Sequence, residues 1–117
     1  MVTKEEVEQF LSTFGVKVKV FDIIYMDERH KNSQALLELE ITPAQRTEVI
    51  TNLTVEDFSE RIKDQMLGSD YLWVFGKDVK GKEVYIKISL GRPNSQTICI
   101  SFHVAEYPMC YPFKTTK

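Results

Sequence analysis

The sequence predicts an α+β domain in which N-terminal helices pack on one face of a three- to four-stranded, mainly antiparallel sheet. Apolar residues in the first half of the chain recur at helical spacing, and two capping boxes open such segments. From residue 71 onward apolar and polar residues alternate, as is typical of half-buried strands, and glycine-containing turns separate the alternating runs. Helices first and strands last favour a single α+β domain over residues 1–117.

The first predicted element is a helix over residues 4–14. Thr3 and Glu6 have the spacing of a capping box, in which the threonine hydroxyl accepts the Glu6 amide and the glutamate reaches back to the cap. The following apolar side chains fall on one helical face: Val7, Phe10, Leu11 and Phe14. We expect Gly15 to end this helix.

Residues 16–21 alternate in the period of a strand, which is expected to continue through Tyr25. Residues 27–32 are mostly charged and are predicted to form a loop. Ser33 is then the expected cap of a helix over residues 34–40.

A second capping box, formed by Thr42 and Gln45, opens the next helix with proline at its first position, where the missing N–H removes no hydrogen bond. Residues 54–57 are expected to open another short helix that carries Phe58 and Ile62 toward the core. Residues 68–70 break the helical pattern.

Three strands are predicted after this break, over residues 71–77, 83–90 and 97–103. Lys80 and Gly81 form the tip of the first hairpin, since glycine supplies the positive φ of a tight turn. Residues 91–95 form the second connection, and prolines make the C-terminal tail irregular. Alternation assigns one face to Val84, Ile86, Ile88, Leu90, Ile98, Ile100 and Phe102, and the other face to Tyr85, Lys87, Ser89, Cys99, Ser101 and His103.

The net charge of −2 argues weakly against wholesale nucleic-acid binding, but the charge is unevenly distributed. Residues 1–70 carry 8 basic and 14 acidic side chains, whereas residues 71–117 carry 7 and 3. This asymmetry fits a basic working surface on an acidic helical part, although chance segregation explains it nearly as well. The two cysteines lack metal-ligand spacing, the N-terminus is acidic, and no apolar run approaches the roughly 20 residues of a membrane span. We therefore expect a cytoplasmic protein without cofactor, metal or membrane contact.

Several motifs follow one another between residues 33 and 104: Val49-Ile50-x-x-Leu53-Thr54-x-x-Asp57-Phe58, Trp73, Gly81-x-x-Val84-Tyr85-Ile86-Lys87-Ile88 and Ile100-Ser101-Phe102. Their order and spacing resemble the MqsR family of type II toxin–antitoxin systems, whose toxins are mRNA interferases. The resemblance implies a RelE-like fold, ribosome-independent cleavage of mRNA, and neutralisation by an antitoxin protein encoded nearby.

Position by position, the resemblance places the family's strand tyrosine at Tyr85 and its lysine at Lys87. His103 stands where the family has a second lysine, Glu60 where it has a third, and Val74 where it has a glutamine. The substitutions at these last three positions argue against the family's catalytic mechanism more than against its fold.

RNA cleavage by the 2′-hydroxyl needs a base, positive charge at the phosphate, and an acid for the leaving oxygen. Tyr85, Lys87 and His103 are predicted on one face of strands about 4.8 Å apart, so they can converge on one phosphate. Histidine exchanges protons near neutral pH, so His103 is the acid–base candidate. Lys87 would stabilise the charge on the phosphate. Tyr85 would orient the phosphate or protonate the leaving oxygen. A surface histidine, a solvent-facing lysine and a packed tyrosine are the simpler explanations.

A second group of side chains is predicted to contact RNA: Lys77, Lys80, Lys82, Arg92, Tyr107 and Tyr111. The basic ones would follow the phosphate backbone, although lysines beside a turn glycine are also ordinary solvated turn chemistry. The tyrosines, each followed by proline, would stack on unpaired bases. Trp73 and Phe75 could also stack, but such residues more often belong to the core.

The sequence thus predicts a metal-independent endoribonuclease that acts as a toxin on mRNA and inhibits translation and growth, with an antitoxin as its protein partner. The alternative is a non-catalytic RNA- or protein-binding regulatory module with the same fold. The substituted positions and the acidic pI of about 5.7 favour the alternative, while the intact Val84-Tyr85-Ile86-Lys87 run favours the enzyme. The oligomeric state is not predicted.

Overall fold

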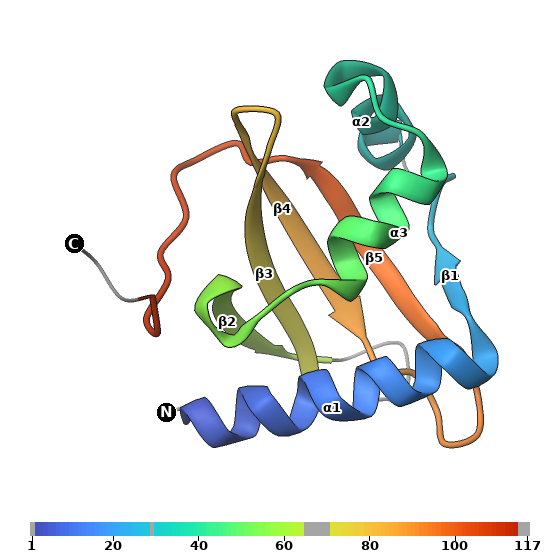
Figure 1. Ribbon diagram of the computed structural model, residues 1–117, viewed down its shortest axis with the longest axis vertical. Coiled ribbons are helices and arrows are strands. Elements are labelled where there is room, and N and C mark those ends of the chain that lie inside the picture. The colour runs from blue at the N-terminus through green and yellow to red at the C-terminus, as the bar shows by residue number, and fades with distance from the viewer. Residues whose placement is uncertain (1, 29, 65–70, 115–117) are drawn as a thin grey trace.

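The computed structural model describes residues 2–28, 30–64 and 71–114, which form helices and one sheet (Figure 1). The helices are α1 (Lys4–Phe21), α2 (His30–Leu39) and α3 (Pro43–Thr51), followed by a 3-10 turn at Val55–Asp57. The strands are β1 (Ile23–Tyr25), β2 (Phe58–Lys63), β3 (Tyr71–Val79), β4 (Lys82–Ser89) and β5 (Thr97–Val104). The break predicted at residues 68–70 lies outside the described residues.

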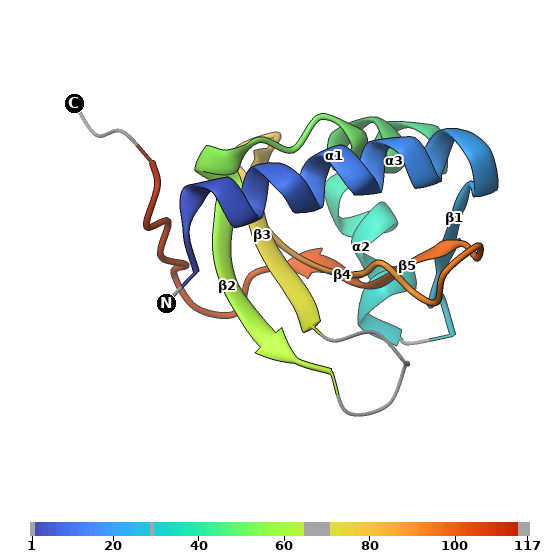
Figure 2. The ribbon, with the colours of Figure 1, turned by 90° about the horizontal axis from the view of Figure 1, so that it is seen from below.

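The five strands form a mixed sheet in the order β1-β5-β4-β3-β2. β1 runs parallel to β5, and the other neighbouring pairs are antiparallel. α1 and α3 cover one face of the sheet, while α2 packs against β5 (Figure 2). The α+β class is confirmed. The predicted three or four strands are corrected to five, because β1 and β2 extend the sheet at its two edges.

α1 runs through Gly15, so the helix end predicted there and the strand predicted over residues 16–21 are both wrong. Phe14 and Val18 continue the core-facing helical spacing, whereas the valines on either side of Val18 are exposed. The three valines therefore do not share one face, as they would in a strand, but are divided between the buried and the exposed face of a helix. The helix ends at Phe21, because the next residue, Asp22, has a φ of 72° that stops the helical backbone before β1.

Both predicted capping boxes are confirmed. The Thr3 hydroxyl accepts from the Glu6 amide at 3.1 Å, and the Thr42 hydroxyl accepts from the Gln45 amide at 3.1 Å. In each box the side chain of the third residue accepts from the backbone N–H of the cap. These local bonds fix where α1 and α3 begin.

α2 begins at His30, inside the segment predicted as a charged loop, so Ser33 is not its cap. The added turn contains Asn32, which is 3% exposed and bonds to the edge of β5. A long-range contact therefore extends the helix beyond what the local sequence indicates.

Residues 58–63 form a strand, β2, rather than the predicted helix. Val55–Asp57 make a single 3-10 turn, after which the backbone pairs with β3. Phe58 reaches the core as expected, but Ile62 lies opposite Leu72 on the other face of the sheet. Pairing along a neighbouring strand thus overrides the local helix signal.

The predicted hairpin turn is confirmed, since Lys80 and Gly81 both have positive φ angles, 53° and 85°. β5 contains a bulge at Ile100, because consecutive residues of β4 pair with Ser101 and Cys99. Cys99 therefore faces the core cluster instead of sharing a face with Ser101, which corrects the predicted alternation.

The core is built around aromatic side chains between the sheet and α1. Phe10 stacks on Trp73 and Phe75 with ring centroids 4.6 and 5.7 Å apart, and Phe58 packs against both. Trp73 and Phe75 are buried, which confirms the core explanation for them. Within the described part of the chain, none of the helices combines the length and apolar character needed to span a membrane.

Candidate functional site

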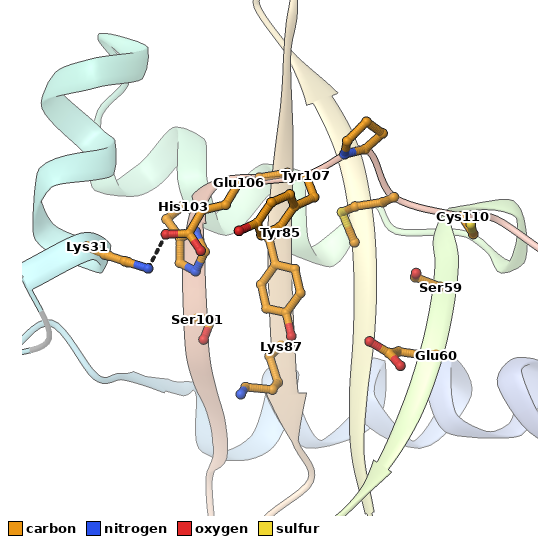
Figure 3. Close-up of a pocket in the computed structure, with 13 residues that line it drawn as sticks. Lys31, Ser59, Glu60, Tyr85, Lys87, Ser101, His103, Glu106, Tyr107 and Cys110 are labelled. Carbon is orange, nitrogen blue, oxygen red and sulfur yellow. Dashed lines mark hydrogen bonds and ion pairs between the residues drawn. The ribbon is translucent and has the colours of Figure 1, made fainter.

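The sheet face opposite α1 and α3 carries a cavity of about 560 Å³ (Figure 3). β4 and β5 form its floor, β2 borders one side, α2 reaches in from the other, and the segment after β5 crosses one end. The polar and charged side chains lining it include Lys31, Ser59, Glu60, Tyr85, Lys87, Ser101, His103 and Glu106.

Tyr85, Lys87 and His103 all line this cavity, so they share one face as the alternation predicted. Tyr85 lies opposite His103 in the β4–β5 ladder, and their rings stack with centroids 5.3 Å apart and planes 15° apart. Lys87 lies opposite Ser101 on the same face. The structure thereby brings together the side chains predicted to act on a phosphate.

A buried asparagine fixes the part of β5 that carries His103. The Asn32 amide donates to the carbonyl oxygens of Met26 and Ile100 at 2.9 and 2.7 Å, and its oxygen accepts from the Phe102 amide at 3.1 Å. β1 pairs with β5 only as far as Cys99, so these bonds satisfy the edge of β5 beyond the end of β1. They hold the bulge that directs the following residues toward the cavity.

The imidazole of His103 is oriented by two contacts. Its Nδ1 lies 3.0 Å from the carbonyl oxygen of Val104. Because a carbonyl oxygen only accepts, Nδ1 must carry the proton in this bond, which leaves Nε2 as the acceptor of the neutral ring. Tyr85 stacks on the ring. The side chain is therefore arranged for proton transfer through Nε2.

The segment of residues 105–113, which we call the strap, is held to the sheet by Glu83 of β4. The Glu83 carbonyl oxygen accepts from the Ala105 amide at 2.8 Å. Its carboxylate accepts from the Met109 amide at 3.2 Å and from the Tyr111 hydroxyl at 2.5 Å. Three bonds to one residue thus fix the irregular tail against the sheet, where it closes one end of the cavity.

Two carboxylates lie among the basic side chains of the cavity. Glu106 of the strap forms an ion pair with Lys31 of α2 (Figure 3). The hydrogen bond and then the charge of Lys31 lower the pKa of Glu106. Glu60 stands across the cavity on β2 (Figure 3). The cavity therefore has mixed charge.

Two of the lysines predicted to follow RNA point away from the cavity. Lys77 lies opposite Val84 on the helix-covered face, and its ammonium nitrogen is 3.3 Å from the Asp57 carboxylate. Lys80 donates to the carbonyl oxygen of Glu40, at the end of α2, at 2.8 Å. Both lysines stabilise contacts with the helical layer.

The other predicted RNA contacts are divided. Lys82 and Arg92 are exposed, but neither lines the cavity. Tyr107 lines it and is 80% exposed, so it is available for stacking. Tyr111 instead packs over Gly76, where a side chain would collide with its hydroxyl. Burial, and then the bond to the neighbouring carboxylate, raise the pKa of Tyr111. The predicted basic rim is not formed around this site.

Sequence reasoning missed Lys31, Ser59 and Glu106. Lys31 fell in a predicted loop and Glu106 in an irregular tail, so no periodicity assigned either one to a face. Ser101 shares the alternation of His103, and that signal could have identified it. Within the described ranges, no three His, Cys, Asp or Glu side chains gather as metal ligands.

Comparisons of the chain with protein-family models, curated proteins and solved structures find no match.

Proposed function

We propose that this protein is an endoribonuclease that cleaves mRNA, a toxin of the MqsR kind with a RelE-like fold. The observation that carries the proposal is the convergence of Tyr85, Lys87 and His103 on one open cavity. Cytoplasmic action and an antitoxin encoded nearby belong to the same proposal and rest on the sequence resemblance.

In the proposed reaction the 2′-oxygen of one nucleotide attacks the adjacent phosphorus and displaces the 5′-oxygen of the next. The products are a 2′,3′-cyclic phosphate and a 5′-hydroxyl end. His103 takes the 2′-hydroxyl proton at Nε2, and Lys87 stabilises the negative charge of the phosphorane. The Tyr85 hydroxyl protonates the leaving oxygen, and solvent returns a proton to Tyr85 as His103 releases its own.

The test combines growth and cleavage. Induced expression should arrest growth, and co-expression of the neighbouring antitoxin gene should restore it. The purified protein should cleave unstructured RNA without ribosomes and in the presence of a metal chelator. H103A and K87A should each slow cleavage by about 100-fold or more, the contribution expected of one proton-transfer or charge-stabilising group. K19A, on α1 away from the cavity, should cleave like the wild type. Healthy growth together with intact RNA would refute the proposal.

A non-catalytic RNA- or protein-binding module is the second candidate, and the carboxylates Glu60 and Glu106 favour it, since they oppose a phosphate in the cavity. Such a module would bind RNA or a protein without cleaving RNA, and H103A would not change its effect on growth.

A further inference from the structure

The cavity on the open sheet face adjoins a second one of about 380 Å³ that lies along α2 and the end of β5. Four residues line both cavities: Lys31, His103, Ala105 and Glu106. The ion pair between Lys31 and Glu106, drawn as a dashed line in Figure 3, therefore stands on the boundary between the two cavities.

Glu106 places a negative charge beside the two basic side chains of this boundary. Its carboxylate is bonded to Lys31, and both side chains line the two cavities together with His103. A carboxylate and a phosphate present the same kind of anionic oxygen acceptors to the ammonium group of Lys31. The position of Glu106 is thus one that an anionic group of a ligand can also take.

We propose that Lys31, on this boundary beside His103, forms a binding site for one phosphate group of a nucleic-acid strand, and that Glu106 occupies this site until the phosphate displaces it. The inference rests on the proposed function for its ligand class. It adds Lys31 to the site as a phosphate-binding residue and makes Glu106 an internal competitor of the substrate.

The exchange requires little rearrangement of the fold. The side chains of Lys31 and Glu106 are 59% and 55% exposed, and an exposed ion pair changes an equilibrium constant by at most about fivefold. Glu83 holds the strap through Ala105 and Met109, on either side of Glu106. The Glu106 side chain can therefore rotate away while the strap backbone stays docked.

The arrangement also reconciles the acidic side chain with a phosphate-binding cavity. While Glu106 is paired, it neutralises Lys31 and weakens binding of any anion that does not replace it. A phosphate that displaces it gains Lys31 as a partner and moves the repelling carboxylate toward solvent. A strand bound in this way would continue from the first cavity into the second, past His103.

The first test is a titration with inorganic phosphate, followed by the imidazole NMR signals of His103. E106Q should bind phosphate about two- to fivefold more tightly than the wild type, because the competing charge is lost. K31M should bind it more weakly than the wild type. E8Q removes the same charge from the exposed surface of α1 and should match the wild type. Equal phosphate affinity in E106Q and the wild type, or undiminished affinity in K31M, would overturn the inference.

The second test repeats the comparison with a 2′-O-methyl RNA oligonucleotide, which lacks the attacking hydroxyl and cannot be cleaved by this route. K31M should reduce the slope of log affinity against log salt by about 0.7, as expected for one lost phosphate contact on a single strand. E106Q should bind the oligonucleotide more tightly. Phosphate binding that does not extend to the oligonucleotide would overturn nucleic acid as the ligand.

Different results would refute the phosphate site and the proposed endoribonuclease activity. Tighter phosphate and oligonucleotide binding by E106Q without any RNA cleavage would support the phosphate site and refute the endoribonuclease. RNA cleavage by the wild type with unchanged affinities in E106Q would support the enzyme and refute the site.

Discussion

Replacing Asn32 with alanine should destabilise the protein far more than its place at the start of a short surface helix suggests. The amide is 3% exposed and makes three hydrogen bonds, two of them to the edge of β5. Each bond contributes about 1 kcal/mol net, and N32A removes all three from a buried or half-buried site. We expect N32A to lower the free energy of unfolding by about 2–4 kcal/mol.

A second substitution separates hydrogen bonding from packing. N32D keeps the shape of the side chain and the acceptor for the Phe102 amide, but it places a carboxylate oxygen against the carbonyl oxygens of Met26 and Ile100. Two acceptors facing each other in a buried site repel, and the charge is poorly solvated. N32D should therefore be at least as destabilising as N32A, despite its closer size.

Urea unfolding followed by fluorescence measures the effect, because Trp73 is the only tryptophan and is 8% exposed in the core. N52A is the matched control, since the exposed Asn52 amide makes one bond, to the Glu48 carbonyl at 2.7 Å. The control should cost less than about 1 kcal/mol. Equal losses in N32A and N52A would refute the argument that Asn32 holds the bulged edge of β5.

Two further outcomes follow from the helix and the thiols. G15A should raise the free energy of unfolding by about 0.5–1 kcal/mol in the same urea assay. Gly15 is inside α1, and an added methyl group meets no atom within 4 Å. A loss of stability in G15A would contradict a continuous α1. In the native protein a disulfide reagent should modify only Cys110, which is exposed, because Cys99 is 2% exposed and burial raises its pKa to about 12. The C110S variant should show no fast reaction until it is unfolded, and rapid native modification of C110S would be inconsistent with the buried thiol.

Features that depend on local chemistry were predictable from the sequence. The capping boxes at Thr3 and Thr42 and the turn at Gly81 follow from bonds and backbone angles within a few residues. α1 was predicted too short because valine and lysine alternate after Gly15, and both periods fit so short a stretch. A long-range contact stabilises the helix here, since the Lys17 ammonium donates to the carbonyl oxygens of Leu90 and Arg92 in the β4–β5 connection.

The bulge in β5 could not be predicted, because it depends on residues far apart in the chain. Strict alternation assigned Cys99 to the wrong face, and only the pairing with β4 shows the extra residue at Ile100. The group that satisfies this edge is Asn32, about 70 residues earlier, in a segment read as a loop. The same alternation was correct for His103, because this residue lies beyond the bulge, where it pairs directly with Tyr85 of β4 and shares its face.

The candidate site likewise has one part that local sequence patterns predict, its floor, and one part that they do not, its walls. Its floor, with Tyr85, Lys87 and His103, follows from strand alternation and a hairpin. Its walls, with Lys31 and Glu106, come from a helix and a strap that only tertiary contacts place. In the proposed reaction the floor supplies groups for proton transfer and charge stabilisation, and in the proposed phosphate site the walls supply Lys31 and its competitor Glu106. Cleavage of RNA would show that the floor is catalytic, whereas displacement of Glu106 by phosphate would show only that the walls bind an anion. The residues of the proposed phosphate site, Lys31 and Glu106, therefore lie in the part of the cavity that the sequence could not place.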